Sequence, residues 1–151
     1  MIELDLTVWE KQLRLKREAG VSYLLDPIRN KWLVLQPEEI VRQLMVQYLL
    51  QEKHYNKNRI RIEQGLLVNG LSKRCDILIY NKAVQPFLMV ECKSPKVPIT
   101  QATFEQIANY NLPLQVKYLV VTNGPATFCC EMDYETRSFN FLSSIPEYQN
   151  F

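Results

Sequence analysis

The segment Phe87–Lys93 constrains the fold more than any other part of the chain. It begins with the four apolar residues FLMV, which predict a strand, and it ends with Glu91 and Lys93. Side chains alternate across a strand, so these two charged groups point to the same face. A buried carboxylate is costly unless a cation or hydrogen-bond donors lie beside it. The end of this strand is therefore the first place to look for a functional site.

A second acid lies upstream, in a neighbouring strand pattern. The run CDILIY predicts a short strand over residues 75–80 with Asp76 near its start. The carboxylates of Asp76 and Glu91 can share a divalent cation such as Mg²⁺, with the carbonyl of Cys92 as a further ligand, because this ion prefers hard oxygen donors. Such an ion neutralises charge on phosphate and lowers the pKa of a bound water, which Lys93 would position. The pattern is typical of phosphodiester cleavage; the alternative is a surface Glu–Lys pair on an edge strand.

The rest of the chain predicts an α/β fold, with a central sheet flanked by helices. Pro37 starts a first helix that runs to about Lys53, and Thr100 caps a second helix that runs to about Asn111. Strands are predicted over residues 21–25, 31–35, 59–68, 75–80, 86–93, 117–123, 126–132 and 137–141. Residues 1–20 form an N-terminal extension.

Length and composition favour one folded domain over residues 1–151. The chain is 47% hydrophobic and 23% charged, with a net charge of +2, so its total charge neither demands nor excludes a nucleic-acid partner. No apolar run approaches the ~20 residues of a membrane span and no signal peptide is present, which predicts a cytoplasmic protein. The four cysteines make no zinc pattern and are expected to be free thiols: Cys75, Cys92, Cys129 and Cys130.

Two segments, RCDILIY at 74–80 and VECKSP at 90–95, resemble the core of PD-(D/E)xK nucleases. More narrowly, they resemble the N-terminal nuclease domain of type I restriction enzyme R subunits. Further similar segments occupy residues 37–43, 106–110 and 122–124, so the resemblance covers about residues 21–148. It implies a restriction-endonuclease-like fold with a mixed central sheet, and an endonuclease that cuts DNA with Mg²⁺ or Mn²⁺ in restriction–modification.

The resemblance also implies roles for residues outside the two strands. Gln106 and Tyr110 match a QxxxY motif, and because positions i and i+4 share a helix face, both can reach toward the DNA or the catalytic lysine. The alternative is that Tyr110 packs in the core while Gln106 is merely exposed. Many nucleases of this superfamily place a glutamate of the first helix near the metal. Candidates are Glu39, Glu38 and, on a strand, Glu63.

Two departures from the family pattern affect the expected role. Cys75 replaces the proline before the first acid. The ATP-driven motor of R subunits has no counterpart here, because residues 65–72 have the glycine spacing of a P-loop but carry Leu71 where the phosphate-binding lysine is required. Partners are therefore expected to be DNA and a separate motor or specificity protein. Double-strand cleavage would need two copies, hence a homodimer.

A basic segment and two alternative functions complete the sequence-based picture. Residues 53–61, with Lys73, Arg74 and Lys96, can contact phosphates in a salt-dependent, sequence-independent way, or form a solvated loop. The first alternative to a nuclease is a non-catalytic DNA-binding module that acts with a partner protein. The second is a structural or protein-interaction domain, in which the Glu–Lys pair is incidental.

Overall fold

The computed structural model describes residues 2–68 and 70–148 of the chain. The α-helices are α1 (Pro37–Gln51) and α2 (Gln101–Asn111), and the short 3-10 helices are η1 (Leu6–Gln12), η2 (Lys57–Arg59) and η3 (Leu112–Leu114). The strands are β1 (Leu15–Glu18), β2 (Val21–Asp26), β3 (Lys31–Val34), β4 (Ile60–Val68), β5 (Leu71–Tyr80), β6 (Pro86–Cys92), β7 (Tyr118–Thr122), β8 (Thr127–Asp133) and β9 (Ser138–Phe141).

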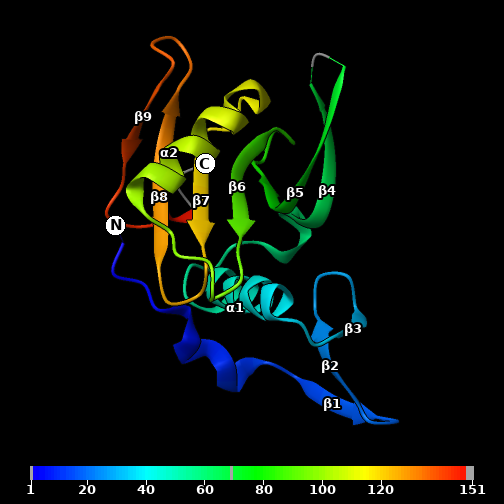
Figure 1. Cartoon of the computed structure of the whole chain (residues 1–151). Helices are drawn as coiled ribbons and strands as arrows, with labels where there is room; N and C mark the ends of the chain where they lie inside the picture. Colours follow the sequence, from blue (N-terminus) through cyan, green and yellow to red (C-terminus); the bar gives the residue numbers. More distant parts are fainter. Residues whose placement is uncertain (1, 69, 149–151) are drawn as a thin grey trace.

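A six-stranded mixed sheet forms the centre of the molecule, in the order β4-β5-β6-β7-β8-β9 (Figure 1). Strands β6 and β7 are parallel and are connected through α2, whereas the other neighbours in this sheet are antiparallel. Strands β1, β2 and β3 form a separate antiparallel sheet. The predicted α/β fold with a mixed central sheet flanked by helices is confirmed.

The two α-helices pack on opposite faces of the six-stranded sheet. Apolar residues of α1 share one core cluster with Ile77, Leu88 and Val90, and α2 contributes Phe104 and Ala108 to a second cluster. The second cluster contains the alternate strand residues, such as Leu78 and Met89, as the two-residue period of strands requires. No helix in the described part of the chain is long and apolar enough to cross a membrane.

The N-terminal extension contributes to the core on the α1 side. Leu6 is fully buried, and its backbone N–H donates to the carbonyl of Gly124 at 3.0 Å. Ile2 pairs with Thr127 at the edge of β8, where its N–H donates to the Thr127 carbonyl at 3.1 Å. The first 20 residues are thus a packed part of the fold, with a short helix and a strand.

The helix starts follow from the capping residues read in the sequence. Pro37 is the first residue of α1, followed by Glu38 and Glu39 in the first turn. The Thr100 hydroxyl accepts a hydrogen bond from the backbone N–H of Thr103 at 3.1 Å, which caps α2. Both starts match the prediction.

Strand β5 is longer than the sequence predicts. It begins at Leu71 rather than at residue 75, because the backbone of residues 71–75 pairs with residues 64–68 of β4. The polar run of Ser72, Lys73 and Arg74 hides this extension from a search for apolar alternation. The rejected P-loop segment at 65–72 belongs to this β4–β5 hairpin, except for Asn69, which lies outside the described residues.

Candidate active site

Strands β5 and β6 bring the three predicted catalytic residues to one end of the sheet. Ile77 pairs with Val90, so Asp76 and Glu91 occupy the next positions on their strands. A carboxylate oxygen of Asp76 accepts a hydrogen bond from the backbone N–H of Cys92 at 2.8 Å. The Lys93 N–H donates to the carbonyl of Thr122 at 2.8 Å and so fixes the end of β6 against β7.

A cavity of about 280 Å³ lies against this strand end. Its lining includes Glu91 and Lys93 from the sheet and Gln106 and Tyr110 from α2. The strand alternation and the i, i+4 spacing on the helix thus place these four side chains around one space. Tyr110 is 68% exposed, so the alternative in which its ring packs in the core is wrong.

Asp76 turns toward α1 because the pleat of β4 and β5 is broken there. In a regular strand, residues 75 and 77 would lie on the same face of the sheet. Here Ile77, which pairs with Ile62, belongs to the core cluster on the α1 side, whereas Cys75 belongs to the cluster on the α2 side. Across the strands lies Glu63, whose φ of 52° falls in the left-handed region that non-glycine residues rarely adopt. The break lets the carboxylates of both Glu63 and Asp76 reach α1.

Glu91 carries an unusual charge environment. Its pKa is raised from 4.5 to about 7, chiefly by burial and also by the neighbouring carboxylate of Asp76, while Lys93 opposes both effects. Glu38, in the first turn of α1, also raises this pKa. A second positive charge at this position would therefore stabilise the ionised form of Glu91.

The raised pKa of Glu91 predicts a pH-dependent cost to stability. The folded chain binds more protons than the unfolded chain between pH 4.5 and about 7, so the free energy of unfolding should fall as the pH rises through this range. The change corresponds to on the order of 3 kcal/mol. Urea unfolding at pH 5 and pH 8, without divalent ions, should therefore show that Glu91→Gln gains stability over the wild type only at pH 8. Parallel pH profiles of the two proteins would contradict the assignment.

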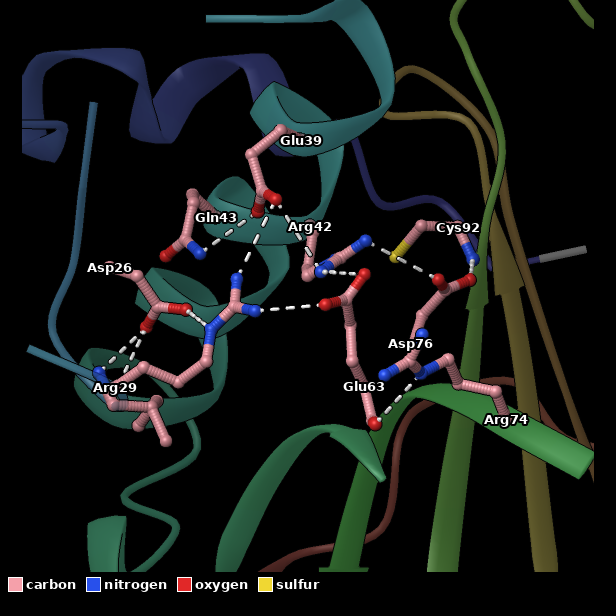
Figure 2. A network of polar contacts seen from close by, with 10 residues as sticks. Asp26, Arg29, Glu39, Arg42, Gln43, Glu63, Arg74, Asp76 and Cys92 are labelled. Atoms are coloured by element: carbon pink, nitrogen blue, oxygen red, sulfur yellow. Dashed lines mark hydrogen bonds and ion pairs between the residues drawn. The ribbon is translucent and has the colours of Figure 1, made fainter. Parts of the chain in front are cut away.

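A partly buried set of ion pairs, here called the arginine network, lies beside Asp76 (Figure 2). It consists of Asp26, Arg29, Glu39, Arg42, Glu63 and Asp76. The guanidinium of Arg42 lies 3.4 Å from Glu39, 3.4 Å from Glu63 and 3.5 Å from Asp76, in each case between a nitrogen and a carboxylate oxygen. Arg42 is only 7% exposed.

The network extends to the turn between β2 and β3 through a second arginine. Arg29 pairs with fully buried Asp26 at 2.5 Å and with Glu63 at 3.0 Å, and it lies 3.6 Å from Glu39. Asp26 also accepts the N–H groups of Ile28 and Arg29, which shapes the turn. The hairpin before α1 is thus connected electrostatically to the strand that carries Asp76.

The three candidate early acids occupy different environments. Glu39 and Glu63 are paired with both arginines of the network. Burial opposes ionisation of Glu63, but the guanidinium groups of Arg42 and Arg29 outweigh it, and its pKa is lowered. Glu38 lies within electrostatic range of Glu91 instead.

Lys73 is a site residue that the sequence placed only among the candidate phosphate contacts. Its ammonium lies 3.4 Å from the centroid of the Tyr110 ring and donates to the Tyr110 carbonyl. Burial lowers the pKa of Lys73, while Glu91 acts in the opposite direction. Lys73 thus brings a second amine beside Glu91 and holds Tyr110 against β5, although the sequence pattern offered only a basic residue near the strand.

The donor set suits a hydrated magnesium ion better than a closed protein cage. Within residues 2–68 and 70–148, no three His, Cys, Asp or Glu side chains form a metal-binding group. Mg²⁺ usually keeps several waters and takes one or two carboxylates plus substrate phosphates. Asp76 and Glu91 supply two carboxylates at one strand end, and the pKa of Glu91 is raised first by burial and then by the carboxylate of Asp76.

In the predicted basic segment, one residue is used by the fold and two others remain able to contact phosphates. Lys53 is buried and its ammonium donates to Glu147 at 2.7 Å, so it serves the fold. Arg59 and Arg61 donate to the backbone carbonyls of Asn81 and Asn58, and both line a cavity of about 560 Å³ beside β4. These two arginines remain candidates for phosphate contacts.

Comparisons with known proteins show the family and the fold of the chain. A family model described as the type I restriction enzyme R protein N terminus matches residues 37–146. The fold is similar to a solved fragment described as an HsdR subunit of a type I restriction enzyme from Vibrio vulnificus YJ016, with 24% identity and a TM-score of 0.51. That match covers 76% of this chain and 24% of the solved one. Among curated proteins, none matches the chain significantly.

Proposed function

Because this chain belongs to the family of type I restriction enzyme R protein N termini, we propose that it is a divalent-metal-dependent DNA nuclease domain. The reaction is hydrolysis, in which a water attacks the phosphorus and the bond from phosphorus to the leaving oxygen breaks. Asp76 and Glu91, with the carbonyl of Cys92, would hold Mg²⁺ or Mn²⁺. The ion supplies charge neutralisation on phosphate and a more acidic bound water.

One observation carries this proposal: the acids and the lysine meet at one strand end. Glu91 and Lys93 line the same cavity, and Asp76 bonds to the N–H of Cys92 between them. The Lys93 ammonium, on the same face as Glu91, would orient the attacking water or stabilise charge on the phosphate. Gln106 and Tyr110, on the opposite wall of the cavity, would position Lys93 or the DNA backbone.

Nicking of supercoiled plasmid with Mg²⁺ or Mn²⁺ tests the proposal. The wild type should nick DNA, and Lys93→Ala should lose at least about 10²-fold in rate, the usual contribution of a group that positions or deprotonates the nucleophile. Lys82→Ala is the matched control, because Lys82 is exposed in the turn that precedes β6, at the opposite end of that strand. Equal nicking rates for Lys93→Ala and wild type would overturn the role of Lys93.

A non-catalytic DNA-binding module is the second candidate, and one observation favours it. Both carboxylate oxygens of Asp76 already face protein groups, the N–H of Cys92 and the guanidinium of Arg42. A module of this kind would bind DNA in a salt-sensitive manner, would leave plasmid uncut with either metal, and would bind equally well after Lys93→Ala. The nicking assay combined with a gel-shift titration separates the two functions.

The proposed partners follow from the family to which the chain belongs. The chain spans about a quarter of the length of the solved structure that it matches. We propose that a nuclease domain of this family acts on DNA together with a separate motor or specificity protein, in the cytoplasm. The part of the chain that the structure describes carries a single site of this kind, so cutting both strands would call for two copies.

A further inference from the structure

Building on the proposed nuclease site, we propose that Lys73 is a positioning residue for DNA binding. It holds the Tyr110 side chain at the mouth of the catalytic cavity, where the ring and its hydroxyl contact the sugar–phosphate backbone of the strand to be cut. Lys73 acts through Tyr110 and does not touch the reacting atoms.

Lys73 lies on a part of β5 that extends past β6. The pairing of β5 with β6 begins at Ile77, whereas residues 71–75 of β5 pair with residues 64–68 of β4. These two segments, here called the arm, form the projecting end of the hairpin (Figure 1). Leu66, directly opposite Lys73, packs against the core cluster on the α2 side. The arm therefore leans toward α2, and Lys73 faces this helix.

The Lys73 ammonium makes two contacts with one residue of α2. It lies 3.4 Å from the centroid of the Tyr110 ring and donates a hydrogen bond to the Tyr110 carbonyl. The last carbonyls of a helix have no partner within the helix, and a positive charge is favourable beside them. Helix α2 has no basic residue in its own last turn, so the arm supplies a charge that the helix sequence lacks. Lys73 thus fixes both the main chain and the ring of Tyr110.

Tyr110 is held in place without being buried. Its largely exposed side chain lines the cavity together with Glu91 and Lys93. Lys73 lies over one face of the ring, and the hydroxyl makes no hydrogen bond to any described residue. Tyrosine hydroxyls are regular phosphate contacts in DNA complexes. A ring whose orientation is already fixed loses less side-chain freedom when it binds. The position of Tyr110 therefore suits a contact with DNA.

The residue after Lys73 offers a matched control. Strand alternation turns Arg74 to the opposite face of the arm, where its Nε donates to the carbonyl of Glu63 at 3.2 Å. Arg74→Met removes the same charge as Lys73→Met, from the neighbouring position, but breaks a contact with Glu63 in place of the contact with Tyr110. An effect that depends only on positive charge near the DNA would be shared by both variants.

A double-mutant cycle on DNA affinity tests the inference. The affinity of the full chain for a fluorescein-labelled DNA duplex is measured by fluorescence anisotropy in EDTA. Lys73→Met and Tyr110→Ala should each weaken binding about 10-fold, the usual effect of losing a hydrogen bond to a charged group. The double variant should also lose about 10-fold, because Lys73 acts through Tyr110, whereas independent residues would lose about 100-fold. Lys73→Arg keeps the cation and its donors and should bind as the wild type does.

The control variants decide whether the coupling is specific. Arg74→Met combined with Tyr110→Ala should lose the product of the two single losses. Urea unfolding checks that each variant is folded. If Tyr110→Ala does not fold, Tyr110→Phe takes its place, since it keeps the ring over Lys73 and removes only the hydroxyl. The loss in its double variant with Lys73→Met should then again be smaller than the product of the single losses.

The outcomes separate this inference from the proposed function. Independent losses for Lys73→Met and Tyr110→Ala, or an unchanged affinity of Lys73→Met, would overturn the role of Lys73 even if the wild type nicks plasmid. Coupled losses in a wild-type background that binds DNA but never cuts it would overturn the nuclease proposal and leave Lys73 as a positioning residue. Absence of DNA binding by the wild type would overturn both.

Discussion

Asp76→Asn should reduce DNA cleavage by about 10³-fold or more while the domain keeps its fold. The amide retains an oxygen that can accept the N–H of Cys92, so the end of β6 stays in place beside β5. It loses the negative charge that a divalent cation requires, and metal ions contribute several kcal/mol to phosphoryl transfer, of which about 4 kcal/mol corresponds to about 10³-fold. Plasmid nicking measures the rate, and urea unfolding should show a loss in stability within about 1 kcal/mol.

The control for this prediction is a carboxylate that is remote from the strand end. Asp133 lies at the end of β8 and accepts backbone N–H groups of the following turn. Asp133→Asn should leave the nicking rate unchanged. If Asp76→Asn unfolded the domain, or if it cut DNA as fast as the wild type, Asp76 would have a structural role and the metal site would lie elsewhere.

Arg42→Met should destabilise the domain by about 3–5 kcal/mol at pH 8, because it leaves Glu39, Glu63 and Asp76 near one another without their shared guanidinium. Methionine replaces the arginine stem with a flexible apolar chain of similar length, so little of the loss should come from a cavity. The pKa of Glu63 is held low by Arg42, so its contribution to stability is present above the unfolded pKa and disappears as the pH falls. The effect of the variant should therefore shrink toward pH 4.

Urea unfolding at pH 8 and pH 4 measures this difference. Arg17→Met is the matched control, because Arg17 is exposed on β1 and its loss should change stability by less than about 0.5 kcal/mol. A pH-independent loss for Arg42→Met would show that Arg42 stabilises the fold by packing alone. An unchanged free energy of unfolding would mean that the cost of burying the Arg42 guanidinium equals the gain from its ion pairs with the three acids.

The sequence predicted the elements whose signals are local. The apolar run of β6 identified a central strand, and Pro37 and Thr100 marked the starts of both helices. The placement of Glu91 and Lys93 on one face followed from strand alternation. The position of Asp76 beside β6 followed from antiparallel pairing of neighbouring strands, which a short connection favours.

The arginine network could not be predicted in this way. Arg42 lies in a helix whose sequence pattern is apolar, and its partners Glu63 and Asp76 are 21 and 34 residues away in the chain. Only the three-dimensional arrangement brings them together. The one local signal was the spacing of Glu39 and Arg42, which are three residues apart on a helix face, and such pairs are common on solvated surfaces. The break in the pleat at Glu63 left no mark in the sequence either, since glutamate is not a residue that favours a left-handed backbone.

The contacts of Arg29 determine which residues must be included when this domain is transferred to another protein. Similarity to the family begins at residue 37, whereas Arg29 lies in the hairpin before it, where Asp26 holds it, and neutralises charge on Glu39 and Glu63. A piece excised or grafted at the similarity boundary would thus carry the acids with half of their guanidinium groups. The module that can be moved intact into another protein starts earlier, before β2, and its boundary is set by charge balance rather than by resemblance.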